Sequence, residues 1–210
     1  MPKIYPIVEG DGEVDAVPLL LRRYLSEVKQ RYDIQVAPSK NAHSRNNLLK
    51  PDGLERFLKY ADKEPEVLGI LLILDTEEQC AKDLAFALSK RARKLSLKYP
   101  VVIVCAQCEY EAWFLASLET IKPHTKLIDS ARYDSPVEER RGVKQWLTSQ
   151  MPSGKAYKET EDQPAMTSHL DFDLVRPKSR SFRRLEHAID ELLALENTTI
   201  RGYVSPQPSE

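Results

Sequence analysis

The sequence predicts an α/β fold, Rossmann-like in outline: a mostly parallel sheet flanked by helices and followed by a C-terminal helical extension. Apolar or β-branched segments alternate with amphipathic ones in the order strand, helix, strand, helix, strand. The run Leu68–Leu74 is continuously apolar, which is typical of a strand covered by helices on both faces. Beyond Pro123 strand signals end, and prolines punctuate segments with helical patterns.

The expected elements follow from this periodicity. A helix must begin near Asp15, because Pro18 is tolerated in a first turn and not in a helix interior. In chain order we expect strand 3–8, this helix, strand 34–36, a basic loop at 39–47, helix 52–61, strand 68–74, helix 82–97, strand 101–105 and an apolar stretch at 112–118.

We predict two parts, an α/β core at 1–123 and a helical extension at 124–210 that packs on it. The extension should hold helices near 138–150 and 181–195. No segment inside it reads as a linker, so it should not form an independent unit. The tail from Ser205 is expected to be frayed.

Composition excludes several classes of protein. The chain has 210 residues, of which 41% are hydrophobic and 30% charged, and its formal net charge is −1, as in an ordinary globular protein. Its longest apolar run has seven residues, too few to cross a bilayer, and the N-terminus lacks the features of a signal peptide. We therefore expect a cytoplasmic protein with no membrane partner.

The three cysteines give no disulfide framework. Cys105 and Cys108 form a C-x-x-C pair, but neither a second pair nor a nearby histidine completes the four ligands of a structural zinc site. Buried thiols at the end of a strand are the favoured interpretation.

Carboxylates follow three of the expected strands. Glu9 follows the first, Asp75 and Glu77 follow the central run, and Glu109 and Glu111 follow the last. Ligands of open α/β sheets bind outside the carboxyl ends of the strands, so these side chains can converge if the strands are parallel. Oxygen ligands without His or Cys indicate Mg²⁺ or Mn²⁺. The alternative is that they are solvated turn residues and helix caps.

Two short motifs resemble the Toprim fold, which topoisomerases, bacterial primases and nucleases of the overcoming-lysogenization-defect type share. They are Val8-Glu-Gly10 after the first strand and Leu74-Asp-Thr-Glu77 after the hydrophobic strand. This resemblance covers about residues 3–118. It implies that Glu9 acts as a metal ligand or acid–base residue, and that Asp75 and Glu77 stand for the first two acids of an Asp-x-Asp motif. Gln79 occupies the place of a third acid, which puts two-metal chemistry in doubt.

A second resemblance covers nearly the whole chain. It is to a bacterial Toprim-like family known as domain-of-unknown-function family 4276. It implies a Toprim-like core with a helical tail, often encoded near ATPases in systems thought to defend bacteria against phage. The segments that carry it are Val8-Glu-Gly-Asp-Gly-Glu13, Leu74-Asp-Thr-Glu-Glu-Gln-Cys80, Glu109-Tyr-Glu-Ala-Trp-Phe-Leu-Ala116, Tyr157-Lys-Glu159 with Asp162-Gln163, and Ser179-Arg-Ser-Phe-Arg-Arg-Leu185.

Basic residues are the candidate phosphate ligands. Lys158 could reach the acidic edge and stabilise a phosphate, or could simply be solvated. Arg180, Arg183 and Arg184 lie in a basic run that would attract a phosphate backbone, or could form a solvated helix start. Lys40 and Arg45 in the early loop form a weaker candidate.

We therefore hypothesise a Mg²⁺- or Mn²⁺-dependent nuclease, in which Glu9 and Asp75 act with Lys158 and the acidic residues bind the metal. DNA is expected in preference to RNA, a partner ATPase is implied by the second resemblance, and assembly into a homo-oligomer stays open. The alternative is a non-catalytic module that binds nucleic acid or the ATPase, which Gln79 favours.

Overall fold

The computed structural model describes residues 1–196, 198 and 201–206. It is an α/β structure built on one six-stranded sheet, in which the recorded strand pairs are all parallel. This confirms the predicted fold class. The strands are β1 (Lys3–Val8), β2 (Gln35–Val36), β3 (Lys40–Asn41), β4 (Val67–Asp75), β5 (Val101–Ala106) and β6 (Val204–Ser205).

The strand order reverses at β1, which lies between β2 and β4. The strand order of the sheet is β2-β1-β4-β5-β6. The short strand β3 also pairs with β1, so β2 lies beside the start of β1 and β3 beside its end. The chain leaves β1 toward β2 and later returns to the opposite side of β1 with β4 and β5. Such a reversal is a topological switch point, where open α/β sheets bind their ligands.

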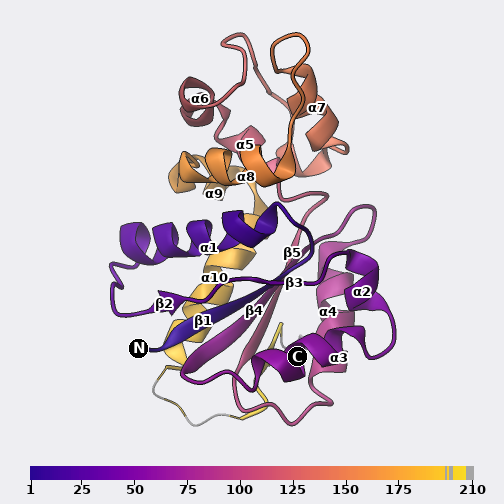
Figure 1. The fold of residues 1–210 in the computed structure, drawn as a ribbon, viewed down its shortest axis with the longest axis vertical. Helices are drawn as coiled ribbons and strands as arrows, with labels where there is room; N and C mark the ends of the chain where they lie inside the picture. Colours follow the sequence, from indigo (N-terminus) through magenta and orange to yellow (C-terminus); the bar gives the residue numbers. More distant parts are fainter. Residues whose placement is uncertain (197, 199–200, 207–210) are drawn as a thin grey trace.

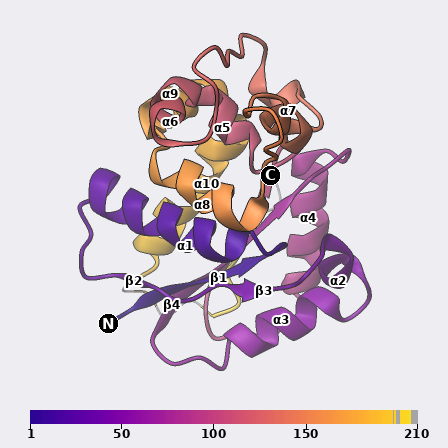
Figure 2. The same ribbon diagram turned by 45° about the horizontal axis from the view of Figure 1, so that its top comes forward.

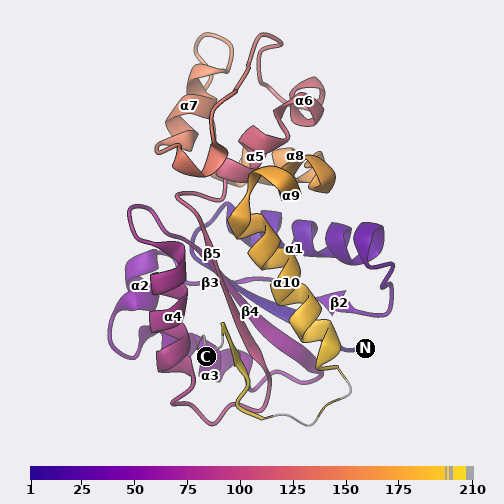
Figure 3. The same ribbon diagram turned by 180° about the vertical axis from the view of Figure 1, so that it is seen from behind.

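Helices cover both faces of the sheet (Figures 1 and 3). On one face α1 and α10 pack against β1, β4 and β5, and on the other face α3 and α4 pack against the alternate residues of the same strands. Both faces of β4 are buried along its whole length, which explains its continuous apolar sequence. These helices are α1 (Glu13–Arg23), α2 (Arg45–Leu49), α3 (Gly53–Ala61), α4 (Ala81–Ala92) and α10 (Arg180–Ala194).

The remaining helices form a layer above the carboxyl edge of the sheet (Figures 1 and 2). They are α5 (Ala112–Ala116), α6 (Leu118–Ile121), α7 (Val143–Ser149), α8 (Glu159–Ser168) and α9 (Phe172–Lys178). Helix α8 lies against α1, and α9 contacts α5. The domain boundary expected at residue 123 stays a prediction. Two elements from beyond that residue nevertheless form part of the core: β6 is a strand of the sheet, and α10 packs against β4 and β5.

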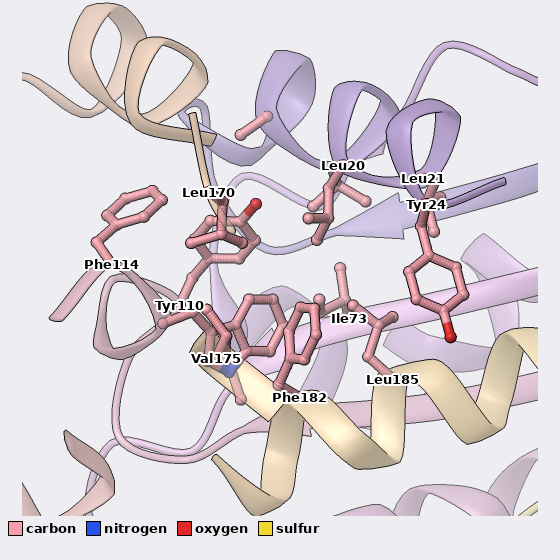
Figure 4. Packing of buried hydrophobic residues seen from close by; sticks show 14 of the residues in the cluster. Leu20, Leu21, Tyr24, Ile73, Tyr110, Phe114, Leu170, Val175, Phe182 and Leu185 are labelled. Carbon is pink, nitrogen blue, oxygen red and sulfur yellow. The ribbon is translucent and has the colours of Figure 1, made fainter. Parts of the chain in front are cut away.

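One hydrophobic cluster joins this upper layer to the sheet (Figure 4). Phe182 and Leu185 of α10 point toward Ile73 of β4 and toward α1. Trp113 packs on Phe182 with ring centroids 5.4 Å apart and donates its indole N–H to Ser181 Oγ at 3.0 Å. The layer that carries Glu109 and Glu111 is thereby fixed relative to the strands.

Several predicted boundaries were wrong, for local reasons. Helix α1 begins at Glu13, two residues before Asp15, and it contains Pro18 in its interior. The helix expected at 82–97 is α4, which ends at Ala92 and not at Leu97. The segment 39–47 is not a loop throughout, because it contains β3 and the start of α2, whose N-cap is Ser44.

The C-terminal part also differs from the prediction. The helix expected at 138–150 is a 3₁₀ turn at Val137–Glu139 followed by α7. Helices α8 and α9 were not predicted, and β6 shows that strands do not end at residue 123. Ser205 is paired and buried, so fraying does not begin there, and residues 207–210 lie outside the described part of the chain. The helix expected at 181–195 is confirmed as α10.

None of the described helices has the length and apolar character needed to cross a membrane.

Candidate metal and catalytic site

The turn after β1 brings two glutamates to the carboxyl ends of β1 and β4. Glu9 follows the last residue of β1, and Glu13 is the first residue of α1. Glu13 folds back so that its Oε2 accepts hydrogen bonds from the backbone N–H groups of Glu9 at 2.8 Å and Gly10 at 2.9 Å. Gly12 permits this turn to touch α8, since a Cβ at this position would lie 2.2 Å from Gln163 Oε1.

Asp75 and Glu111 come to the same place from β4 and from the segment after β5. Asp75 N–H donates to Glu9 Oε2 at 3.1 Å, and Asp75 Oδ1 accepts from Tyr110 N–H at 2.8 Å. Glu111 is completely buried, and its Oε1 accepts from the Tyr157 hydroxyl at 2.9 Å. We call Glu9, Glu13, Asp75 and Glu111 the carboxylate cluster.

The cluster is electrostatically strained. The pKa of Glu13 is raised to about 8. Burial is the main cause, and the negative charges of Glu9 and Glu111 add to it. Burial raises the pKa of Glu111 to about 7, although Lys144 acts in the opposite direction. The pKa of Asp75 lies well above its ordinary value, because of burial first and then because of the three other carboxylates.

Lys144 is the cation that faces the cluster. Its Nζ lies 3.1 Å from Glu159 Oε1 and 3.9 Å from Glu111 Oε1. Burial lowers the pKa of Lys144, but Glu111, Asp75 and Glu159 outweigh that effect and raise the pKa above its ordinary value. The ammonium group therefore stays charged at neutral pH.

Glu109 positions Lys144. Its two carboxylate oxygens accept hydrogen bonds from the backbone N–H groups of Gly142 at 3.1 Å and Lys144 at 3.2 Å, at the start of α7. Gly142 has a φ of +66°, which an L side chain rarely adopts, so the glycine allows the chain to enter the helix here. Glu109 thus anchors a helix and does not itself face the cluster.

A small cavity opens onto the cluster. Its volume is about 150 Å³, which is room for an ion together with several water molecules. It is lined by Glu9, Gly10, Gly12, Glu13, His43, Ser44, Asp75, Lys144, Glu159 and Gln163. Two buried atoms have no hydrogen-bond partner in the described structure: Gln163 Oε1, whose residue lines the cavity, and Glu111 Oε2, whose residue belongs to the cluster but does not line the cavity.

The donor set fits a hydrated hard cation. Each cluster carboxylate uses one oxygen on a backbone N–H or a hydroxyl, and the second oxygen makes no hydrogen bond within the described residues. Across the same residues, no three His, Cys, Asp or Glu side chains form a ready-made cage for one ion. Mg²⁺ is suited to such a site, because it keeps several waters and uses only one or two protein carboxylates.

Glu77 lies outside the cluster. It is exposed and pairs with Arg45, whose guanidinium donates to Glu77 Oε2 at 2.7 Å and to Gln79 Oε1 at 2.5 Å. Glu77 and Gln79 are therefore tied together by one arginine. Asp75 alone reaches the cavity from this segment.

Lys158 also lies away from the carboxylates. Its side chain is exposed, and its Nζ forms a salt bridge of 2.9 Å with Glu161. Of the two lysines in this region, the structure places Lys144 and not Lys158 at the cavity.

The candidate phosphate ligands fall into separate places. Lys40 lies over the ring of Tyr60, 4.7 Å from its centroid. Arg180, Arg183 and Arg184 line a different cavity, at the start of α10.

The chain matches the model of the family described as domain of unknown function DUF4276 over residues 8–190. The chain belongs to this family. The matched span contains all four cluster carboxylates and Lys144. We found no match among curated proteins and none among solved structures.

Sequence reasoning missed two residues of this DUF4276 site, Glu13 and Lys144. The signal for Glu13 was its spacing: an acid four residues after Glu9, at the first position of a helix, can fold back on the preceding turn. Lys144 had no comparable signal, because its position depends on Glu109, 35 residues earlier.

The cluster predicts an unusual pH dependence of stability without metal. Between the ordinary pKa of a glutamate and the raised pKa of Glu111, the folded DUF4276 protein keeps a proton that the unfolded chain has lost. The free energy of unfolding in EDTA should therefore fall as the pH rises from about 5 to about 8, by up to about 1.4 kcal/mol per pH unit for each such group. Glu111→Gln should flatten this fall and raise the melting temperature at the alkaline end.

Glu161→Gln is the matched control for this measurement. Glu161 is exposed, and hydrogen bonds from Lys158 and Lys126 lower its pKa, so it does not titrate in this range. Urea unfolding of the three proteins across the pH series gives the slopes. Equal slopes in wild type and Glu111→Gln would contradict the raised pKa of Glu111.

Proposed function

We propose that the protein hydrolyses phosphodiester bonds of nucleic acid with Mg²⁺ or Mn²⁺ bound at the carboxylate cluster, and that its core is related to the Toprim fold. The observation that carries this proposal is the convergence of Glu9 and Asp75 at the switch point of the sheet, next to an unpartnered buried oxygen of Glu111 and the ammonium group of Lys144. Carboxylates and a lysine around a cavity with room for water are the parts that phosphoryl transfer requires.

Glu9 and Asp75 line the cavity and would hold the ion, and water would complete its coordination. When bound, the ion would stabilise negative charge on the attacking and leaving oxygens. It would also offset the repulsion among carboxylates whose pKa values are raised by burial and by one another.

Glu9 is the best candidate for proton transfer. Its Oε2 is fixed on Asp75 N–H, while its other oxygen has no hydrogen-bond partner in the described structure. Burial is the main cause that raises the pKa of Glu9, which brings it closer to the value suited to a general base. Glu9 would accept a proton from the attacking water.

Lys144 would hold a non-bridging phosphate oxygen. It lies at the cavity, is charged at neutral pH, and is oriented through Glu109 and Glu159. This replaces the role first expected for Lys158, whose charge is directed to Glu161 at the surface.

One observation favours a non-catalytic alternative. Arg45 engages both Glu77 and Gln79, so the segment after Asp75 offers fewer free acids than a two-metal nuclease requires. A module that only binds nucleic acid or a partner ATPase would show no metal-dependent cleavage, alone or with the ATPase present.

Replacing Glu9 separates the two functions. Glu9→Gln keeps the size of the side chain but removes its charge, so cleavage of plasmid, linear and single-stranded DNA in Mg²⁺ or Mn²⁺ should fall by about two orders of magnitude or more. Affinity for DNA should change little, because basic residues supply most of it. Cleavage that persists at the wild-type rate in Glu9→Gln would contradict the mechanism and indicate a contaminating nuclease.

A pair of lysine variants tests which lysine acts. Lys144→Met should lower the cleavage rate by about 10²-fold, as expected for loss of a charge aimed at the reacting phosphate. Lys158→Met also removes one positive charge, but at the protein surface, and should leave the cleavage rate within about twofold of that of the wild type. Both proteins are first checked for cooperative unfolding in Mg²⁺. The reverse order of effects would return the phosphate ligand to Lys158.

A further inference from the structure

A second and larger cavity lies on the β5 side of the sheet. Its volume is about 630 Å³, and the start of α4, the end of β5, the turn at 136–139 and the start of α10 surround it. Figure 3 shows α4 and α10 on opposite sides of β5. This cavity shares no lining residue with the cavity at the carboxylate cluster.

Cations dominate the charge of this cavity. Its lining includes five basic residues and two acidic ones, namely Lys82, Lys178, Arg180, Arg183, Arg184, Glu138 and Glu139. Among these, Arg184 is neutralised by Glu191, to which it donates at 2.6 Å. Glu138 is also engaged, because its Oε1 accepts from Ser179 Oγ and from Ser181 N–H, both at 2.7 Å.

Four of the cations have no carboxylate partner in the described part of the chain. Lys178 donates to the carbonyl oxygen of Ala116, and Arg183 donates to those of Arg176 and Pro177. Lys82 and the exposed guanidinium of Arg180 make no side-chain hydrogen bond to the described residues. The cavity is therefore complementary to an anion.

Part of the wall of this cavity is apolar. It is formed by Ala81, Ala85, Cys105, Pro136 and Pro177. A site that only followed a phosphate backbone would need no such walls. The combination of apolar lining residues with guanidinium groups fits a ligand with a ring system and a phosphate. Gln107 and Glu139 add groups that can hydrogen-bond to a base or a ribose.

We infer that this cavity binds a nucleotide, with its phosphate held by Arg180 and Arg183 and its base against the walls formed by α4 and the prolines. The nucleotide can be free in solution or can be the phosphorylated end of a strand, because both present the same groups. The inference does not rest on the proposed cleavage, since it needs neither a metal nor any cluster carboxylate.

The test is calorimetric titration of the full chain in EDTA. The probes are the four ribonucleoside 5′-monophosphates, the corresponding nucleosides, inorganic phosphate, and one oligonucleotide with and without a 5′-phosphate. At least one phosphorylated probe should bind, at least about tenfold more tightly than its unphosphorylated form and than inorganic phosphate. Tight binding of mononucleotides identifies a free nucleotide, and binding of the 5′-phosphorylated oligonucleotide alone identifies a strand end.

Two variants locate the binding. The double variant Arg180→Ala with Arg183→Ala should weaken nucleotide binding by at least about tenfold. Ala85→Leu should block binding, because the larger side chain occupies space in the cavity while every charged residue remains. The control Lys90→Ala with Lys94→Ala removes two exposed charges outside the cavity and should bind as wild type does. Glu9→Gln should also bind normally, which separates this result from the fate of the nuclease proposal.

The inference is overturned if no phosphorylated probe binds, if inorganic phosphate binds as tightly as the nucleotides, or if both cavity variants bind like wild type. Circular dichroism and melting curves establish that the variants are folded. Because Ala85→Leu leaves all the arginines in place, a folding defect in the double arginine variant does not remove the test.

Discussion

The site depends on one interaction: the repulsion among the four cluster carboxylates, which backbone N–H groups and Lys144 balance. Three of these carboxylates are buried and Glu9 is half-buried. Glu13 closes the turn after β1, Glu9 bonds to the end of β4, and Asp75 bonds to the segment after β5. The same contacts that concentrate negative charge therefore tie three neighbouring strands together at their carboxyl ends. Burying charge is costly unless it is compensated, and here the compensation is incomplete: Glu111 keeps a buried oxygen without a partner.

An arrangement of this kind favours function at the expense of stability. A fold that needed only a closed edge could place apolar or amide side chains at these positions. The cavity instead leaves room for water beside Glu9, Glu13 and Asp75, and Lys144 approaches without closing it. Strain of this kind is typical of catalytic and ligand sites. The second cavity, near α10, shows the opposite charge, so the carboxyl edge of one sheet carries an acidic region and a basic one.

The sequence was sufficient where one pattern determines one element. The apolar run that forms β4 predicted both its position and its burial on both faces, and Glu9 and Asp75 could be placed at a common edge because they follow parallel strands. The strands β2, β3 and β6 have two residues each, too few to show an alternating pattern of apolar and polar residues. Of these three, only β2 was predicted, as a strand at 34–36. Helix α8 was missed because it carries little amphipathic pattern and contains Pro164. Lys144 and the partners of Arg45 are set by tertiary contacts that no local pattern encodes.

Binding of Mn²⁺ at the carboxylate cluster tests the central claim most directly. The electron paramagnetic resonance signal of free aqueous Mn²⁺ can be followed while the protein is added at about pH 7.5, where the metal must displace any proton that the raised pKa values of Glu13 and Asp75 retain on these carboxylates. Wild type should remove the signal in proportion to its concentration, Mg²⁺ should restore it by competition, and Asp75→Asn should leave most of it unchanged, whereas Glu161→Gln should behave as wild type. A wild-type protein that leaves free Mn²⁺ undiminished at millimolar concentrations, or an Asp75→Asn variant that binds as tightly as wild type, would contradict the metal site.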